Sequence, residues 1–276
     1  MEYHVVTSGS CWASLLGHDA EPVRLMAGDV VAFPQGDAHV MSSAPGMRGD
    51  NVEDFESPDK QTQLPVLFNL DGGGAERAHL VCGFLGCDSR PFNPLLEALP
   101  PILHIRSAGT AHSGWLREFS RFAVMEAGEK RMGGTSILSR LGELMFAELV
   151  RRYVESLPEE SRGWLGGLRD RYIGRALNLM HGQPSRDWTL DQLAKEAGLS
   201  RSSFAERFTS YAGIPPMQYL QKWRLQIAAS RLLQGDGIAA IAADTGYESE
   251  AAFSRAFKRV IGVPPAEWRN NRTATG

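Results

Sequence analysis

The chain has 276 residues, of which 43% are hydrophobic and 22% charged, and this length exceeds one typical domain of roughly 100–200 residues. The composition excludes a disordered chain, a collagen and a disulfide-dense mini-protein, and no apolar run reaches the roughly 18 residues of a membrane span. The net charge of −3 is uneven, because residues 1–168 carry −8 and residues 169–276 carry +5. The second half is therefore the part that we expect to approach a polyanion such as DNA.

The N-terminus and the cysteines bear on localisation. The first ten residues have neither a basic region nor a long apolar stretch, so we expect no secretory signal. The three cysteines are Cys11, Cys82 and Cys87, and an odd number leaves at least one thiol unpaired. This suits a reducing compartment, and we expect a cytoplasmic protein without a membrane partner.

Short strands and turns are expected over residues 1–110. Leu25–Pro34 is a turn followed by a β-branched and aromatic run. Pro65–Leu70 and His79–Leu85 read as further strands around the glycine-rich turn Asp71–Gly74. Several short strands at close spacing are typical of a sandwich or an antiparallel barrel.

The pattern becomes helical over residues 111–155. Apolar residues recur there at three- and four-residue spacing between Ile137 and Tyr153. Such an amphipathic helix packs either on its own domain or on a second copy, so a homodimer contact is one of two readings. Residues 156–168, rich in Pro, Gly, Ser and charge, are the expected linker, and residues 169–276 read as an all-helical domain.

An internal repeat is the strongest signal in this helical half. Phe204 and Phe208 recur as Phe253 and Phe257, 49 residues later, and the Gly-x-Pro-Pro motif that follows each pair keeps the same offset. The residues before each pair also match: Gly198 with Ser200, and Gly246 with Ser249.

Each copy of the repeat has the features of a helix-turn-helix. A glycine supplies the positive φ of a tight turn, a serine caps the next helix, and the Phe pair anchors that helix on one face. The rod Pro216–Leu233 between the copies spans about 27 Å, so two recognition helices could lie near one helical turn of DNA apart, roughly 34 Å. A plain helical bundle is the alternative, and the basic charge favours DNA.

The repeat also carries a resemblance. Residues 169–270 resemble the DNA-binding domain of the AraC/XylS family of bacterial transcription regulators, through Gly198-Leu-Ser-Arg-Ser-Ser-Phe204, Gly246-Tyr247, Phe253-Ser-Arg-Ala-Phe257-Lys258 and Gly262-Val-Pro-Pro265. The resemblance implies a sensor domain joined to a double helix-turn-helix, a double-stranded operator as partner, and activation through RNA polymerase as the commoner habit.

Candidate DNA contacts lie opposite the Phe pairs. Arg255 has the geometry to read guanine and Glu206 to accept from cytosine, while Arg201, Lys258 and Arg224 suit phosphates. The full predicted set is Arg201, Ser202, Ala205, Glu206, Arg224, Glu250, Ala251, Ser254, Arg255 and Lys258. An ordinary solvated face is the alternative for each.

The first half resembles the cupin-type sensor of one subgroup of this family. The resemblance rests on His4-Val-Val, Gly28-Asp-Val-Val, Gly36-Asp-Ala-His39 and Val81-Cys-Gly83. It implies an antiparallel β-barrel, and hence an α+β two-domain protein with a cupin-like barrel followed by helices and an all-α double helix-turn-helix. Enzymatic cupins offer a His-x-His motif, whereas His39 is followed by Val40 and Met41. We therefore expect a regulator and not an enzyme; a cupin enzyme with a helical appendage is the weaker alternative.

The sensor's input has more than one reading. Regulators of this subgroup that respond to reactive chlorine have His and Cys at the positions of His4, His39 and Cys82, and imidazole with thiolate suits Zn²⁺. We expect these three to face one barrel interior, with Cys87 or Cys11 as a fourth ligand and Cys82 as the redox-active thiol. His79 is a further imidazole in this half of the chain. The alternative to a sensing role is that the cysteines are buried and unreactive. An organic effector in the barrel is another, with Trp12, Phe33 and Phe68 as wall candidates.

Overall fold

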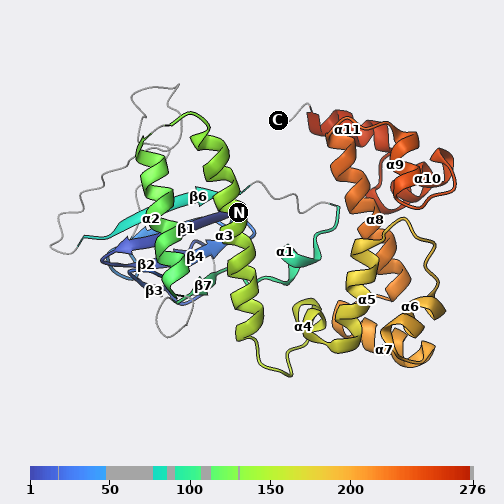
Figure 1. Ribbon diagram of the computed structural model, residues 1–276, viewed down its shortest axis with the longest axis horizontal. Coiled ribbons are helices and arrows are strands. Elements are labelled where there is room, and N and C mark those ends of the chain that lie inside the picture. The colour runs from blue at the N-terminus through green and yellow to red at the C-terminus, as the bar shows by residue number, and fades with distance from the viewer. Residues whose placement is uncertain (18, 48–76, 86–90, 107–112, 130, 274–276) are drawn as a thin grey trace. The chain divides into compact units, whose positions relative to one another are not determined.

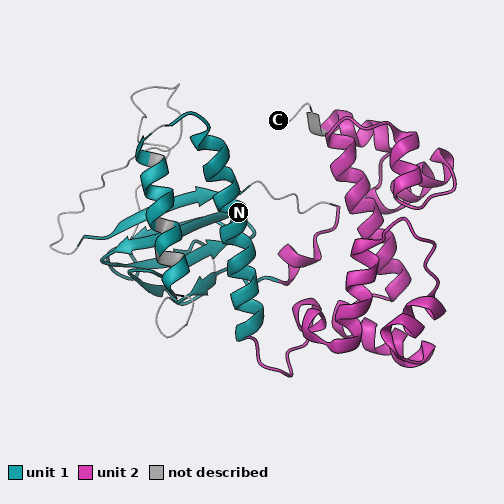
Figure 2. Cartoon of the chain, viewed as in Figure 1, with its two compact units in different colours: residues 1–87, 99–156 teal, residues 88–98, 157–276 magenta. Residues whose placement is uncertain are grey.

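The structure is a computed structural model that describes residues 1–17, 19–47, 77–85, 91–106, 113–129 and 131–273 (Figure 1). The chain forms two compact units (Figure 2). Unit 1 comprises residues 1–87 and 99–156, and unit 2 comprises residues 88–98 and 157–276. The expected α+β two-domain class is confirmed: strands occur in unit 1, and the described part of unit 2 contains helices and no strand.

Unit 1 contains two antiparallel sheets. Its described strands are β1 (Glu2–Ser8), β2 (Ser10–Leu15), β3 (Val23–Met26), β4 (Val30–Phe33), β5 (His39–Ser42), β6 (His79–Phe84) and β7 (Leu103–Ile105). One sheet has the order β6-β1-β4-β7 and the other the order β3-β2-β5. The strand expected at His79–Leu85 is therefore present as β6.

The expected closed barrel is wrong for the described strands. Closure requires hydrogen-bonded pairing between the edge strands of the two sheets, and no such pairing joins them in the part of the chain that the structure describes. The two sheets instead share a core that includes Val6, Ala13, Leu25, Val31 and Phe33. The expected strand Pro65–Leu70 and turn Asp71–Gly74 lie outside the described residues.

Two long helices complete unit 1. Helix α2 (Ser113–Glu129) and helix α3 (Gly134–Ser156) pack on each other, α2 against β1 and α3 against β7 (Figure 1). Met145 and Leu149 of α3 are completely buried, so this amphipathic helix packs on its own domain. No helix of the described residues is long and apolar enough to cross a membrane.

Unit 2 carries the repeat. After α4 (Trp164–Arg169) and α5 (Arg171–Gly182), the first copy is α6 (Leu190–Ala197) and α7 (Arg201–Ala212). The long α8 (Pro216–Leu233) leads to the second copy, α9 (Ile238–Asp244) and α10 (Glu250–Ile261), and α11 (Pro265–Thr273) follows. Each copy has its own hydrophobic core, and α8 contributes to both: Tyr219 and Leu220 to the first, Leu225 and Leu232 to the second.

The stretch expected to be a linker contains structured residues. Helix α4 begins at Trp164, inside the expected linker 156–168. The Trp164 indole nitrogen donates to the Tyr219 hydroxyl at 2.8 Å, and the Trp164 side chain packs on the first core. A tryptophan that finds both an apolar contact and a hydrogen-bond acceptor orders this end of the segment.

A short segment from the first half of the sequence belongs to unit 2. Residues 88–98 include α1 (Pro94–Ala98), and Phe92 just before α1 is buried in the first core. The Phe92 ring meets Tyr219 edge-on at 5.4 Å between centroids. The Phe92 amide donates to Oε1 of Gln226 at 2.9 Å, and the Lys222 ammonium lies 5.2 Å from the ring centroid. One face of α8 is thus covered by residues that the sequence places among the sensor strands.

Candidate DNA-binding and signal-input sites

The two turns of the repeat adopt the local structure that the sequence predicts. Gly198 and Gly246 have φ angles of +82° and +77°. The Ser200 hydroxyl accepts from the Ser203 amide at 3.3 Å, and the Ser249 hydroxyl accepts from the Ala252 amide at 3.1 Å. These caps satisfy amides that a helix N-terminus leaves without an intrahelical partner, so α7 and α10 start at defined points after each turn.

The paired phenylalanines face the two cores. Phe204 and Phe208 of α7 are completely buried, as are Phe253 and Phe257 of α10. The rings within each pair lie 5.7 and 5.6 Å apart. Burying this face leaves the opposite face of each helix exposed, which is the arrangement that a recognition helix needs.

Most of the predicted DNA contacts lie on these exposed faces. On α7 the exposed residues include Arg201, Ser202 and Glu206, with Ala205 half-buried between them. Arg201 forms an ion pair of 2.9 Å with Asp191 at the surface. On α10 the exposed ones are Glu250, Ala251, Arg255 and Lys258, and Ser254 is half-buried. The exposure leaves these side chains available to a ligand, and their contacts with DNA stay predictions.

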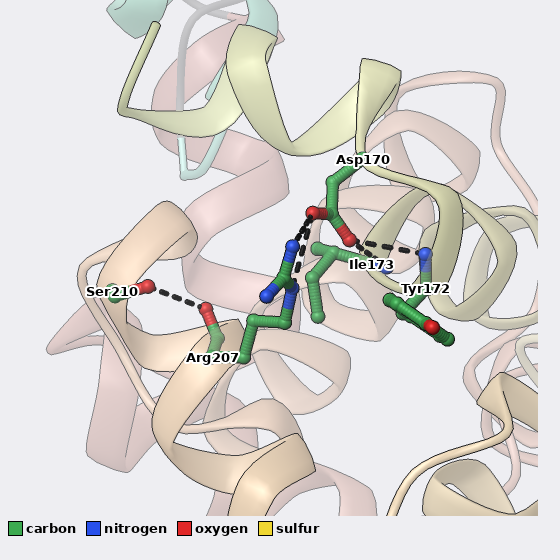
Figure 3. Close-up of polar contacts among 5 residues, drawn as sticks. All are labelled: Asp170, Tyr172, Ile173, Arg207 and Ser210. Carbon is green, nitrogen blue, oxygen red and sulfur yellow. Dashed lines mark hydrogen bonds and ion pairs between the residues drawn. The ribbon is translucent and has the colours of Figure 1, made fainter. Parts of the chain in front are cut away.

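Helix α7 is linked to α5 by Arg207, to which the sequence analysis did not assign a role (Figure 3). Asp170 caps α5 by accepting from the Tyr172 and Ile173 amides at 3.0 and 2.9 Å. The same carboxylate accepts from Nε of Arg207 at 3.0 Å. Burial opposes the charge of Asp170, but the hydrogen bonds from Arg207 and the two amides outweigh it and lower the pKa of this carboxyl.

In unit 1, His4 joins the predicted ligands into one cluster. His4 on β1 and Cys82 on β6 are directly opposite each other in the sheet register. Nδ1 of His4 lies 2.8 Å from Sγ of Cys82, and Nε2 of His4 lies 2.7 Å from Nε2 of His39. His4 is buried, and the Phe33 ring stacks on His39 with 3.7 Å between centroids. The structure therefore brings the three predicted residues together, with Cys82 and His39 on different sides of the His4 ring.

The hydrogen bonds define how protons are distributed in this cluster. Nδ1 of His39 lies 3.0 Å from the Asp37 carbonyl oxygen, which only accepts, so this nitrogen is the donor. In a neutral His39 ring Nε2 then accepts from Nε2 of His4. Nδ1 of His4 is left as an acceptor, and the Cys82 thiol donates to it. In this neutral arrangement the ring nitrogens of both histidines and the Cys82 sulfur have complementary hydrogen-bond partners, and Nε2 of His39 lies in addition 3.6 Å from a Glu2 oxygen.

Desolvation keeps both groups at the centre of the cluster uncharged. Burial, followed by the neighbouring His39, lowers the pKa of His4 to about 4. Cys82 is exposed overall, but its sulfur is directed at the buried His4 ring, and desolvation followed by Glu2 and Cys11 raises the pKa of the thiol to about 11. At neutral pH the metal-free cluster therefore holds a thiol and a neutral imidazole.

Glu2 is a member of the cluster that the sequence analysis missed. One oxygen of Glu2 lies 3.6 Å from Nε2 of His39. Within the described residues Glu2, His4 and His39 form the group of possible metal ligands, with their ligand atoms within 4.8 Å of one another. Glu2 and His4 lie two apart on one strand and so share a face, a signal that was available in the sequence.

The remaining predicted residues of the sensor have other surroundings. Cys11 is buried in the core between the sheets, and burial followed by Asp29 raises the pKa of its thiol to about 11. His79 is exposed and its Nδ1 lies 2.7 Å from the Ser8 hydroxyl. Trp12 is half-buried on β2. Cys87 and Phe68 lie outside the described residues.

Comparison with known proteins gives a family for each half of the chain. The Cupin family matches residues 1–155, and the Helix-turn-helix domain family matches residues 193–271. An AraC-like transcription regulator of Streptomyces lividans is 32% identical over 99% of this chain and 88% of its own. The RCS-specific HTH-type transcriptional activator RclR of Escherichia coli is 30% identical over 98% of this chain and 84% of its own. A crystal structure of the DNA-binding domain of AdpA in complex with a target DNA is 28% identical; the match covers 38% of this chain and 96% of that chain, with a TM-score of 0.35.

The chain belongs to the AraC family of transcription regulators. The resemblance noted in the sequence is thereby confirmed for both halves. This AraC-family regulator has a cupin domain in unit 1 and a helix-turn-helix DNA-binding domain in unit 2. Its named relatives are transcription regulators and not enzymes.

One predicted phosphate contact of this AraC-family regulator has a different environment. Arg224 is half-buried in the middle of α8. Its Nε donates to the Pro184 carbonyl at 2.7 Å, and one terminal nitrogen donates to the Arg186 carbonyl at 2.8 Å. These bonds hold the turn between α5 and α6 against α8. A phosphate contact by Arg224 stays a prediction, but two of its nitrogens already have protein partners.

Proposed function

We propose that this regulator reads two successive major-groove segments of an operator with α7 and α10, and that the His4 cluster of its cupin domain receives the signal. The proposal for DNA is supported by the exposed faces of the two helices opposite their buried Phe pairs. The proposal for the signal is carried by one observation: the Cys82 thiol, in an exposed residue, lies 2.8 Å from a buried imidazole that also contacts His39.

The chemistry of the input is oxidation of the Cys82 sulfur; because burial raises the pKa of this thiol to about 11, the reaction proceeds through the small fraction that is thiolate at neutral pH. A small oxidant such as hypochlorous acid takes two electrons from the sulfur, so that Cys–SH and HOCl give Cys–SOH, H⁺ and Cl⁻. The added oxygen replaces the S–H that donates to His4 with a longer S–O–H group and so enlarges the group beside a buried ring. Because β1 carries His4 and packs against α2, a shift of His4 perturbs the sheet on which α2 lies.

A second input is a metal ion, favoured by Glu2, His4 and His39. Two imidazole nitrogens and a carboxylate suit a divalent transition ion such as Zn²⁺. The donor types and their proximity fit, and since the two Nε2 atoms are at hydrogen-bond distance, the rings would move apart on binding. Cys82 would then remain the partner of the other His4 nitrogen, an outer contact of the kind that orients a ligating histidine.

The test uses the full-length protein and DNA that it selects from a random-sequence library. Zinc content, free thiols and affinity for this DNA are measured before and after treatment with about equimolar hypochlorite. We expect the affinity of the wild type and of Cys11→Ala to change and that of Cys82→Ser to stay constant, since Cys11 lies in the core. A normal response in Cys82→Ser would remove this thiol from the mechanism, and about one zinc per chain lost in His4→Gln and His39→Gln would favour the metal input.

The proposal includes a homodimer and activation in the bacterial cytoplasm. Several apolar side chains on α2 and α3 are exposed, namely Trp115, Phe122, Val124, Met125 and Leu144. A second copy of this chain would cover them, and two chains would bring four recognition helices to one operator, with RNA polymerase as the further partner. Sedimentation of the wild type and of Leu144→Glu tests the dimer: we expect the variant to be monomeric.

A further inference from the structure

The two turns of the repeat differ in what surrounds them. Gly198 and Gly246 share a left-handed conformation, with φ of +82° and +77°. A Cβ atom on Gly198 would meet nothing within 4 Å. A Cβ on Gly246 would lie 2.7 Å from the Ser185 carbonyl oxygen and 2.9 Å from a terminal nitrogen of Arg224. The equivalent positions are therefore alike in backbone and unlike in packing.

Ser185 lies outside the second copy of the repeat, just before the first copy. It lies in the turn between α5 and α6, which precedes the first helix-turn-helix. This turn is firmly seated on the first core: the Trp188 indole donates to the Gln183 carbonyl at 3.0 Å, and Trp188 is 2% exposed. The Arg186 guanidinium lies 3.8 Å from the Trp188 ring centroid. The anchored turn between α5 and α6 thus contacts the turn that precedes α10.

Arg224 joins the same three parts. It lies on α8 between Leu220, which is buried in the first core, and Leu225, which is buried in the second. Its two hydrogen bonds to the Pro184 and Arg186 carbonyls fix the turn between α5 and α6 to α8. The same guanidinium lies against Gly246. At the point where α8 passes from one core to the other, Arg224 therefore connects the turn between α5 and α6 with the turn between α9 and α10.

We propose that Arg224 and Gly246 are positioning residues that set the separation and relative rotation of α7 and α10. The proposal rests on the proposed reading of two DNA segments by these helices. One base pair inserted between the segments changes both their distance and their rotation about the DNA axis, so a protein with rigidly connected helices accepts one spacing. The clamp formed by Arg224, the turn at residues 184–186 and Gly246 determines how strictly this spacing is required.

The experiment measures binding of the full-length protein to a set of spaced DNA probes. The parent probe is selected from a random library by the wild type, and its derivatives carry one base pair inserted or deleted between the two segments, or one segment scrambled. For the wild type we expect a loss of at least about tenfold on each derivative, comparable to a mismatched base pair. The Arg224→Lys and Gly246→Ala variants should bind the parent probe more weakly than the wild type does. Their affinity for the derivatives with altered spacing should be less than about threefold below their own affinity for the parent.

Gly198→Ala is the matched control. This substitution imposes the same positive-φ strain as Gly246→Ala, but the new Cβ would contact no other part of unit 2. The Gly198→Ala variant should therefore keep the wild-type dependence of affinity on spacing even if the protein is less stable. Thermal unfolding of all variants confirms that they are folded. If Arg224→Lys and Gly246→Ala lose affinity equally on every probe, the clamp is overturned.

Two further outcomes have distinct meanings. If Arg224→Gln lowers the slope of log affinity against log salt by about one with an unchanged spacing profile, Arg224 is a phosphate contact and not a clamp. If scrambling either segment leaves wild-type affinity unchanged, the two-segment reading itself fails and this inference fails with it. A spacing profile that broadens in both variants and not in Gly198→Ala supports the clamp.

Discussion

Arg207 of α7 and Asp170, the N-cap of α5, form an ion pair that links α7 to the start of α5 (Figure 3). The Asp170 side chain is 5% exposed, and its two oxygens serve three donors: the Tyr172 and Ile173 amides and the Arg207 guanidinium. Because one carboxylate both starts α5 and holds α7, its removal affects two helices at once.

Asp170→Ala is expected to lower the free energy of unfolding of unit 2 by about 0.5–2 kcal/mol, the range for a lost N-cap. Urea unfolding of the full chain, followed by tryptophan fluorescence, measures it. Since the folded pKa of Asp170 is lowered, its stabilisation is present at neutral pH and is lost as the pH falls through that value. Asp191→Ala, which removes the exposed partner of Arg201, is the control and should cost less than about 1 kcal/mol.

Phe92→Ala tests whether the segment before α1 stabilises unit 2. Phe92 is 6% exposed and contacts Tyr219 in the first core, so we expect a loss of about 3 kcal/mol in the unfolding transition of unit 2. Phe84→Ala is the control, because Phe84 is 66% exposed and its removal should cost less than about 0.5 kcal/mol. Equal effects of the two substitutions would contradict the packing of Phe92 in this core.

His181 should make unit 2 sensitive to acid. Its ring stacks on Trp223 at 4.1 Å and its Nε2 lies 2.9 Å from the Tyr219 hydroxyl, and burial lowers its pKa from 6.5 to about 4. The unfolded chain takes up the proton first, so stability falls as the pH drops from about 6.5 to about 4, by at most about 3 kcal/mol. Thermal unfolding against pH measures this loss, and His181→Gln should have a flatter profile over the same interval.

Arg255 and Lys258 on α10 should have separable effects on DNA binding. Both are exposed, and a guanidinium can bind guanine through two hydrogen bonds whereas an ammonium acts on phosphate as a point charge. Arg255→Ala should lower affinity for selected DNA by about 1–3 kcal/mol and spare random DNA. Lys258→Ala should weaken both equally and reduce the salt slope by about one. Equal losses on selected and random DNA for Arg255→Ala would exclude base reading.

The local structure of the repeat could be predicted because its causes are close together in the sequence. A glycine at a left-handed turn, a capping serine and two phenylalanines four residues apart act within about one helical turn of each other. The same holds for the amphipathic α3 and for the strand β6. These features needed no knowledge of distant contacts, and the structure shows them at Gly198, Ser200 and Phe204 and at their counterparts in the second copy.

Contacts between distant parts of the sequence were decided by the tertiary structure alone. The strand register sets Cys82 opposite His4, 78 residues away, and adds Glu2 to the cluster. The register also leaves the two sheets unjoined in the described residues, where the family pattern implied a closed barrel. Strand pairing depends on which edges meet, and the alternation of side chains along one strand does not specify that partner.

The sequence by itself determined the class of protein: two helix-turn-helix copies on a basic half, and a strand-rich half that contains His and Cys residues. The tertiary structure decided which of two equivalent residues has a second role. Gly198 and Gly246 are alike in sequence and backbone, and only packing against Ser185 and Arg224 distinguishes them. The tertiary structure also decided that Phe92 and Arg224 are buried or partly buried. The free energy of a side chain depends on its neighbours, and here these come from remote parts of the chain.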